Sequence, residues 1–136
     1  MASMRSSRPR YPGIRAIVDG SEAVAHVETR LSEVACVYPI TPSTTMAAIF
    51  QSGVAKGMTN LWGTPIRFIE PESEHSSASA AEGVALSGGR VTNFTAGQGL
   101  VLMKEVLHVI SGKRLPVVFH VGARALTSQA LNIHAG

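Results

Sequence analysis

Short strand-like runs alternate with longer segments of helical periodicity along most of this 136-residue chain. The predicted strands cover residues 34–38, 66–70, 91–95 and 115–121, and the first and last of these are apolar enough to be buried. The helical segments cover residues 21–31, 44–56, 73–87 and 100–110, with Ser21 as the first N-cap and a further helix begun at 127–133. This alternation predicts an α/β fold, an open parallel sheet with helices on both faces. Because the pattern stops in mid-course, we expect the domain to be incomplete at its C-terminus.

The composition fits one globular domain with a hydrophobic core. Hydrophobic residues make up 45% of the chain and charged residues 15%, which is below the roughly 25% of charged residues in an average globular protein. So few charges indicate that other domains or a second subunit cover part of the surface. No apolar run approaches the roughly 18 residues of a membrane-spanning helix.

The positive charge is concentrated at the N-terminus. The formal net charge is +3, and four arginines lie within the first fifteen residues, so the rest of the chain is near neutral. The sequence has no basic stripe with interleaved aromatic residues, which argues against nucleic-acid binding. Residues 1–13 are expected to form a disordered basic tail, with residues 14–136 as the folded part. The tail lacks the apolar segment of a secretory signal, so we expect a cytoplasmic protein, with a short organelle transit peptide as the alternative.

Cys36 is the only cysteine of the chain. A disulfide framework within the chain and an iron–sulfur cluster held by four of its own thiolates are therefore excluded. No spacing of histidine, cysteine and aspartate is typical of a zinc site, so no metal ligand is predicted. Cys36 lies in an apolar run and is expected to pack in the core.

A stiff bend follows the first predicted strand. Pro39 and Pro42 fix φ on either side of Thr41 and exclude regular helix or strand between them. In open α/β sheets, ligands bind at the carboxyl ends of the strands. The hydroxyl of Thr41 is therefore a candidate for orienting a small polar substrate, and the alternative is that this segment only begins the next helix.

Three carboxylates, those of Glu70, Glu72 and Glu74, lie at the junction of the second strand and its helix. The helix dipole favours negative charge there, which alone explains their presence. A functional interpretation needs one buried carboxylate that exchanges a proton with a ligand nitrogen. Glu74 is the best candidate, because its helix face carries small residues. These residues are Ser77, Ala78, Ala81 and Ala85.

The segment Gly97-Gln98-Gly99 follows the third strand and is predicted to form a tight loop into a helix. Such a loop could hold a phosphate, although Leu102 occupies the position of a third dinucleotide-motif glycine. The simpler interpretation is a turn whose backbone lies close to a ligand.

Arg124 follows the fourth strand, where it could bind a carboxylate in bidentate fashion or remain a solvated surface residue. Strand topology would bring Thr41, Glu74, Gly97 and Arg124 to the same edge of the sheet, which favours a site there.

The histidines are scattered along the chain. His26, His108 and His120 lie on segments that are expected to face the core, which predicts structural roles. His75 is adjacent to Glu74 and could either tune the site or lie in solvent.

Several motifs resemble those of one family in order and spacing. They are DGSEAVAH (19–26), YPITPS (38–43), EPESE (70–74), AAEG (80–83), FTAGQGL (94–100), FHV (119–121) and ARA (123–125). Together they resemble the N-terminal domain of pyruvate:ferredoxin (flavodoxin) oxidoreductases, which are thiamine-diphosphate-dependent 2-oxoacid oxidoreductases. The resemblance covers residues 19–132 and implies the pyrimidine-binding fold of thiamine diphosphate enzymes.

The resemblance also implies roles for individual residues. Thr41 resembles the threonine that hydrogen-bonds the 2-oxoacid, and Arg124 resembles the arginine that binds the substrate carboxylate. Glu74 resembles the glutamate that contacts the aminopyrimidine ring, with Gly97 and Gln98 as further cofactor contacts. The family decarboxylates 2-oxoacids oxidatively to acyl-coenzyme A, passes electrons through iron–sulfur clusters to ferredoxin or flavodoxin, and implies a dimer.

Some features depart from the family pattern. His75 and Ser76 replace residues that are usually small, and residues 57–63 match only loosely. Magnesium, iron–sulfur clusters and the coenzyme A region are expected outside this chain, which ends within the first domain. The open alternatives are a non-catalytic truncated product, an interaction domain, or a nucleotide-binding α/β domain of another class.

Overall fold

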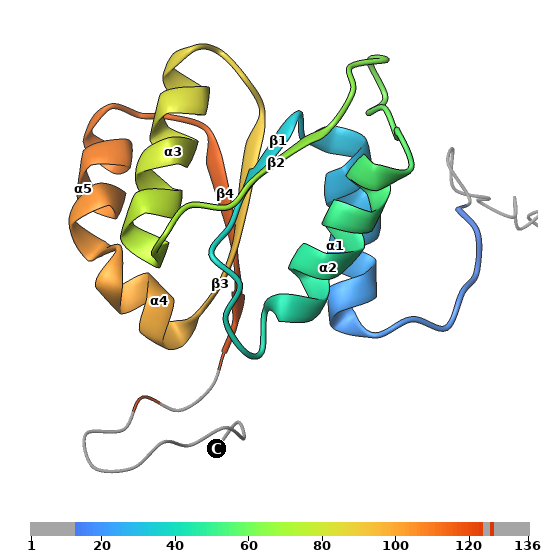
Figure 1. Cartoon of the computed structure of the whole chain (residues 1–136), viewed down its shortest axis with the longest axis horizontal. Coiled ribbons are helices and arrows are strands. Elements are labelled where there is room, and N and C mark those ends of the chain that lie inside the picture. Colours follow the sequence, from blue (N-terminus) through green and yellow to red (C-terminus); the bar gives the residue numbers. More distant parts are fainter. Residues whose placement is uncertain (1–12, 124–125, 127–136) are drawn as a thin grey trace, which may run out of the picture.

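The computed structural model describes residues 13–123 and 126. The strands are β1 (Val34–Cys36), β2 (Arg67–Ile69), β3 (Val91–Ala96) and β4 (Val117–Gly122), and they form one sheet in the order β2-β1-β3-β4. Every pairing is parallel. Helices α1 (Gly20–Leu31) and α2 (Thr44–Ala55) cover one face of this sheet. The other face is covered by α3 (Glu74–Leu86), α4 (Gly97–Leu102) and α5 (Lys104–Gly112), so the predicted α/β fold with helices on both faces is confirmed (Figure 1).

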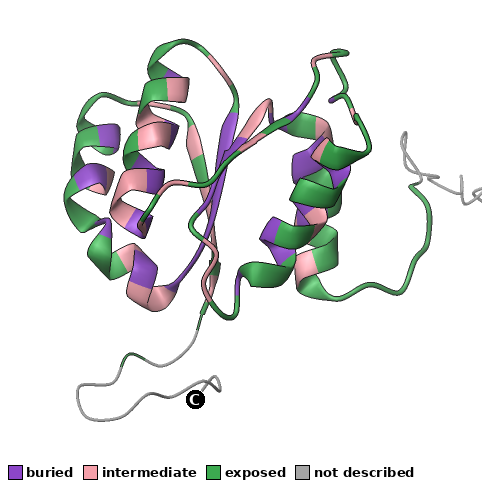
Figure 2. Cartoon of the chain, viewed as in Figure 1, coloured by how far each residue is buried: buried purple, intermediate pink, exposed green. Residues whose placement is uncertain are grey.

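The core lies on both sides of β3, whose six residues are all buried (Figure 2). Side chains alternate across a strand, so β3 supplies both faces at once. Phe50 and Phe94 pack on the α1–α2 side, with ring centroids 6.0 Å apart. Small residues of α3, such as Ala81 and Ala85, pack on the opposite side and allow that helix to approach the sheet closely.

Helix starts are set by capping side chains. α1 is capped by Asp19, whose carboxylate accepts a hydrogen bond from the Glu22 amide, while the Glu22 side chain accepts one from the Asp19 amide. The prediction of Ser21 as N-cap was therefore wrong, because the reciprocal Asp19–Glu22 pair satisfies two amides of the first turn. Ser73 caps α3 in the same way, with Ser76 as its partner.

The loop predicted at Gly97-Gln98-Gly99 is helical. α4 begins at Gly97 immediately after β3, so the glycines form its first turn. The single helix predicted over 100–110 is instead two helices that meet at Met103, whose φ of −86° and ψ of 6° depart from helical values. The side chain of Met103 is fully buried in a cluster with Ala78. Packing of this residue against α3 therefore accompanies the break that periodicity alone did not reveal.

The N-terminal tail, Arg124 and the helix predicted at 127–133 fall wholly or almost wholly outside the described residues. Within the described part, none of the helices combines the length and the apolarity needed to cross a membrane. Cys36 is a free, buried thiol, as predicted, and burial raises its pKa to about 11.

Candidate functional site

The bend after β1 lies against the end of β4. A side-chain carbon placed on Gly122 would lie 3.0 Å from Cγ of Pro42 and 3.3 Å from the amide nitrogen of Ser43. Ser43 is buried, and both its amide and its hydroxyl donate to the carbonyl oxygen of Ile40 at 2.8 Å. These bonds close a turn around the cis Thr41–Pro42 peptide and leave Thr41 exposed at the carboxyl edge of the sheet.

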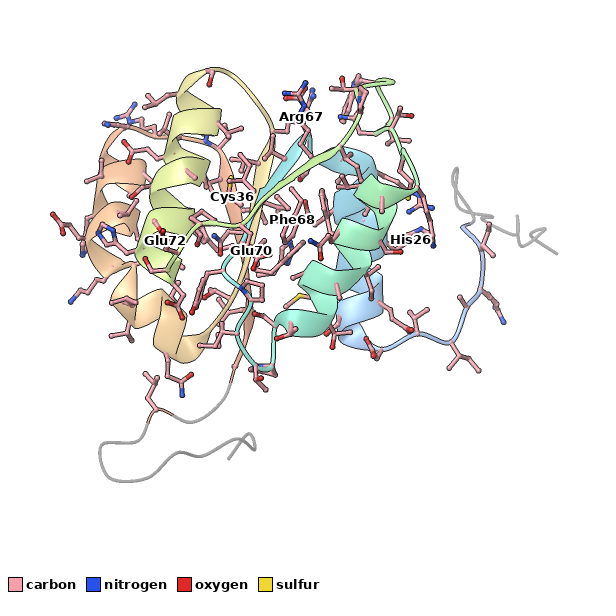
Figure 3. The ribbon with its side chains drawn as sticks, in the orientation of Figure 1. His26, Cys36, Arg67, Phe68, Glu70 and Glu72 are labelled. Atoms are coloured by element: carbon pink, nitrogen blue, oxygen red, sulfur yellow. The ribbon has the colours of Figure 1, made fainter. Side chains whose placement is uncertain are left out.

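Glu74 is the buried member of the three carboxylates at the start of α3. It is 7% exposed, whereas Glu70 and Glu72 are exposed on the connection from β2 (Figure 3). Glu74 thus has the burial that the functional interpretation of this segment requires.

Gly99 brings Glu74 and the end of β3 together. A side-chain carbon on Gly99 would lie 2.7 Å from Cγ of Glu74 and 3.4 Å from its Oε1, and closer still to Oγ1 of Thr95. Only a residue without a side chain fits at this position. The first turn of α4 is therefore pressed against the carboxylate, with Gly97 and Gln98 half-buried beside it.

This contact disfavours the predicted phosphate cradle at Gly97-Gln98-Gly99. A phosphate at the start of α4 would meet the side chain of Glu74, and like charges at short range in a poorly solvated place repel strongly. The geometry favours the other interpretation of the segment, a close approach of backbone to a site that contains a carboxylate.

A buried polar chain anchors the start of α3 to the sheet. The side-chain amide of Asn93 donates to the Cys36 carbonyl oxygen at 2.6 Å and to the Ser77 hydroxyl at 3.0 Å. Ser77 in turn donates to the main-chain carbonyl of Glu74 at 2.8 Å. The backbone of Glu74 is thereby fixed relative to β1 and β3. Sequence reasoning missed Asn93, although a polar residue in a strand buried on both faces was the available signal.

A second polar cluster lies on the opposite face of the sheet. The carboxylate of Glu28 is buried, its Oε1 lies 2.8 Å from Nε2 of His120, and its Oε2 accepts a hydrogen bond from Ser32 at 2.5 Å. Burial acts to raise the pKa of Glu28, but the partners His120 and Ser32 outweigh it and lower that pKa below its usual value. The structural role predicted for His120 is confirmed.

The other histidines differ from expectation. His26 and His108 are exposed, so the prediction that they face the core was wrong; both lie on the solvent sides of their helices. His75 is half-buried, and its Nε2 lies 3.8 Å from Oε2 of Glu105 on α5. An apolar groove of about 1330 Å³ lies elsewhere, along α1, α2 and residues 13–18, and the described candidate site residues do not line it.

Residues 26–136 match the family model described as "Pyruvate flavodoxin/ferredoxin oxidoreductase, thiamine diP-bdg". The chain belongs to this family. It is 46% identical over 116 residues to a pyruvate-flavodoxin oxidoreductase of Klebsiella pneumoniae, covering 85% of this chain and 10% of that protein. A pyruvate:ferredoxin oxidoreductase of Moorella thermoacetica is 47% identical over 116 residues with the same coverage.

The fold also resembles a solved structure. A 2-oxoglutarate:ferredoxin oxidoreductase from Magnetococcus marinus matches with a TM-score of 0.73 and 27% sequence identity, over 90% of this chain and 20% of that one. That structure contains 2-oxoglutarate, coenzyme A and succinyl-coenzyme A. The present chain thus spans about a tenth of the length of the two curated relatives above.

Proposed function

We propose that this chain forms the pyrimidine side of a thiamine diphosphate site in a 2-oxoacid oxidoreductase, with pyruvate as the substrate. The observation that carries the proposal is the position of Glu74, whose side chain is buried at the carboxyl edge of the sheet against the backbone of Gly99. A carboxylate in a poorly solvated place is stabilised by a hydrogen-bond donor, and a ring nitrogen that carries a proton would be such a donor.

The residues present fit the aminopyrimidine half of the cofactor. Gly99 leaves the side chain of Glu74 in place where any larger residue would displace it. The hydrogen bonds from Asn93 to Ser77 and from Ser77 to the Glu74 carbonyl fix the backbone from which Glu74 projects. Thiamine diphosphate, when bound, supplies the electron sink for decarboxylation. The part of Glu74 is to hold the proton at the ring nitrogen and to orient the ring, with Gly97 and Gln98 as backbone contacts.

The substrate contacts are proposed at the neighbouring bend. Thr41 is exposed at the carboxyl edge, and the Pro42–Gly122 contact brings the end of β4 beside it. Arg124 follows Gly122 by two residues and lies outside the described residues. We propose that Thr41 donates a hydrogen bond to the 2-oxoacid and that Arg124 binds its carboxylate, as a bidentate guanidinium can.

The other cofactors and reactants of the proposed reaction need protein outside this chain. Magnesium, iron–sulfur clusters, coenzyme A and the electron acceptor ferredoxin or flavodoxin are proposed to bind outside this chain. A cytoplasmic location and a dimeric state stay predictions. Half of a cofactor site cannot catalyse, so turnover requires the rest of the protein or a partner chain.

The mass of the native polypeptide separates the working enzyme from the alternatives. Immunocapture and mass spectrometry should find either a product far larger than 14.3 kDa or this chain in complex with the missing half. A free 14.3 kDa product without such a partner would favour the truncated, non-catalytic product.

The test of the site is Glu74→Gln in the native assembly that contains this chain. We expect the loss of a proton-transfer group to lower pyruvate-dependent reduction of ferredoxin or flavodoxin by about 10²–10⁴-fold and to weaken thiamine diphosphate binding. Glu72→Gln is the matched control, because it makes the same change in charge on an exposed neighbour. Unchanged activity in Glu74→Gln would overturn the proposal.

A further inference from the structure

The hydroxyl of Thr95 has no hydrogen-bond partner in the described part of the chain, although the residue is only 1% exposed. Thr95 is the penultimate residue of β3, at the carboxyl edge of the sheet. A buried hydroxyl without a partner is destabilising, and such groups are rare in folded proteins. This hydroxyl is therefore expected to find an acceptor when the site is assembled.

Thr95 and Glu74 face each other across Gly99. Oγ1 of Thr95 and Oε1 of Glu74 both lie within 3.4 Å of the point that a side-chain carbon of Gly99 would occupy. The glycine leaves this point empty, so no side chain separates the hydroxyl from the carboxylate. The hydroxyl of Thr95 is a donor without an acceptor, and the carboxylate of Glu74 can accept a hydrogen bond.

The other buried hydroxyl near Glu74 is already engaged. Ser77 donates its proton to the main-chain carbonyl of Glu74 and accepts a hydrogen bond from Asn93. A hydroxyl has one proton to donate, so Ser77 cannot also serve the carboxylate. Thr95 is therefore the buried side chain at Gly99 with a proton to offer.

We propose that Thr95 is a positioning residue for Glu74: its hydroxyl donates a hydrogen bond to one carboxylate oxygen and leaves the other for the ligand's ring nitrogen. This inference rests on the proposed function. A hydrogen bond from a hydroxyl to a carboxylate is charge-assisted and short, so it fixes the direction in which the carboxylate points.

The test compares variants of Thr95 in the native assembly, with calorimetric binding of thiamine diphosphate as the readout. Thr95→Val keeps the shape of the side chain and removes the hydroxyl, whereas Thr95→Ser keeps the hydroxyl and removes a methyl group. We expect Thr95→Val to weaken binding about tenfold, the effect of losing a charge-assisted hydrogen bond, and Thr95→Ser to bind about as the wild type does. A purely structural role predicts the reverse order, because serine leaves a cavity and valine does not.

Thr92→Val is the matched control. Thr92 lies on the same strand and is fully buried, but it faces the α1–α2 side, where its hydroxyl interacts with the carboxylate of Glu28 rather than that of Glu74. Its substitution should leave thiamine diphosphate binding unchanged. If Thr95→Val does not fold, Thr95→Ala against Thr95→Ser makes the same comparison, because both lack the methyl group and only serine has the hydroxyl.

The two proposals fail in different ways. If Glu74→Gln loses binding while Thr95→Val binds as tightly as the wild type, the inference is overturned and the proposed function stands. If neither the wild type nor any variant binds thiamine diphosphate, the proposed function is overturned and the inference with it. In the Glu74→Gln background, Thr95→Val should have little further effect on binding, and independent, additive losses would contradict a role through Glu74.

Discussion

Replacing Gly99 with alanine should destabilise the fold although alanine is the better helix former. The new Cβ would lie 2.7 Å from Cγ of Glu74 and closer still to Oγ1 of Thr95. Thr95 cannot easily withdraw, because it is buried in the central strand and β-branched side chains are stiff at χ1. Overpacking of this kind costs about 1–3 kcal/mol, against a gain of up to about 1 kcal/mol from helix propensity.

Gly83→Ala is the control that isolates the overlap. Gly83 is exposed within α3, and a Cβ there would meet nothing within 4 Å. The same substitution at Gly83 should stabilise the protein by about 0.5–1 kcal/mol. The difference in unfolding free energy between the two variants, about 1–3 kcal/mol, therefore measures the overlap of the new methyl group with Thr95 and Glu74.

Urea-induced unfolding supplies the measurement, with the midpoint compared at constant m-value. The same comparison in a Thr95→Ala background tests the cause of the loss. That variant removes the atom nearest to the new methyl group, so Gly99→Ala should lower the unfolding free energy less there than in the wild type. If Gly99→Ala stabilises the protein as much as Gly83→Ala, then Gly99 does not press on Glu74. In that case the geometry assigned to the candidate site is wrong.

Three further predictions concern buried polar groups. The folded-state pKa of Glu28 lies below its usual value, so its contribution to stability is present above the unfolded pKa of about 4.3 and is lost as pH falls through the lower, folded value. Glu28→Gln should therefore flatten the acid limb of the stability curve measured by urea unfolding, and an unchanged limb would contradict the His120 pair. Cys36, with a pKa raised to about 11, should resist alkylation in the native state at neutral pH and react on unfolding; rapid native labelling would contradict its burial. Asn93→Ala should lower the unfolding free energy by about 1–3 kcal/mol because it leaves Cys36 and Ser77 without their donor, whereas a neutral effect would show that water replaces the amide.

The order of strands and helices could be predicted from the sequence because each element has a clear period. The apolar run around Cys36 and the run that begins at Val91 are too short for helices and lie between turn residues. The start of α4 could not be predicted in this way, since Gly97 and Gly99 have poor helix propensity. Two tertiary contacts accompany the helical turn: Gly99 fits against Glu74, and Met103 packs against α3.

The candidate site could be predicted in part, because parallel topology places strand ends together. Thr41 and Glu74 follow from that rule, and the burial of Glu74 agrees with the small residues on its helix face. Thr95 and Asn93 could not be found in the same way, since a strand residue's partners lie on other elements. His26 shows the converse case, because it shares a helix with the buried Ala25 and yet is exposed.

The alternation of β3 explains how one strand serves two different environments. Asn93 and Thr95 point toward α3, where they contact Ser77 and approach Gly99, whereas Phe94 points toward the α1–α2 core. Thr92 shares the face of Phe94, so it is separated from Glu74 by the sheet itself. A shift of one residue in the register of β3 would therefore bury Phe94 against the site and move both polar side chains into the other core. The pairing of β3 with β4 over six residues opposes such a shift, so Asn93 and Thr95 stay on the α3 side while Phe94 stays in the other core.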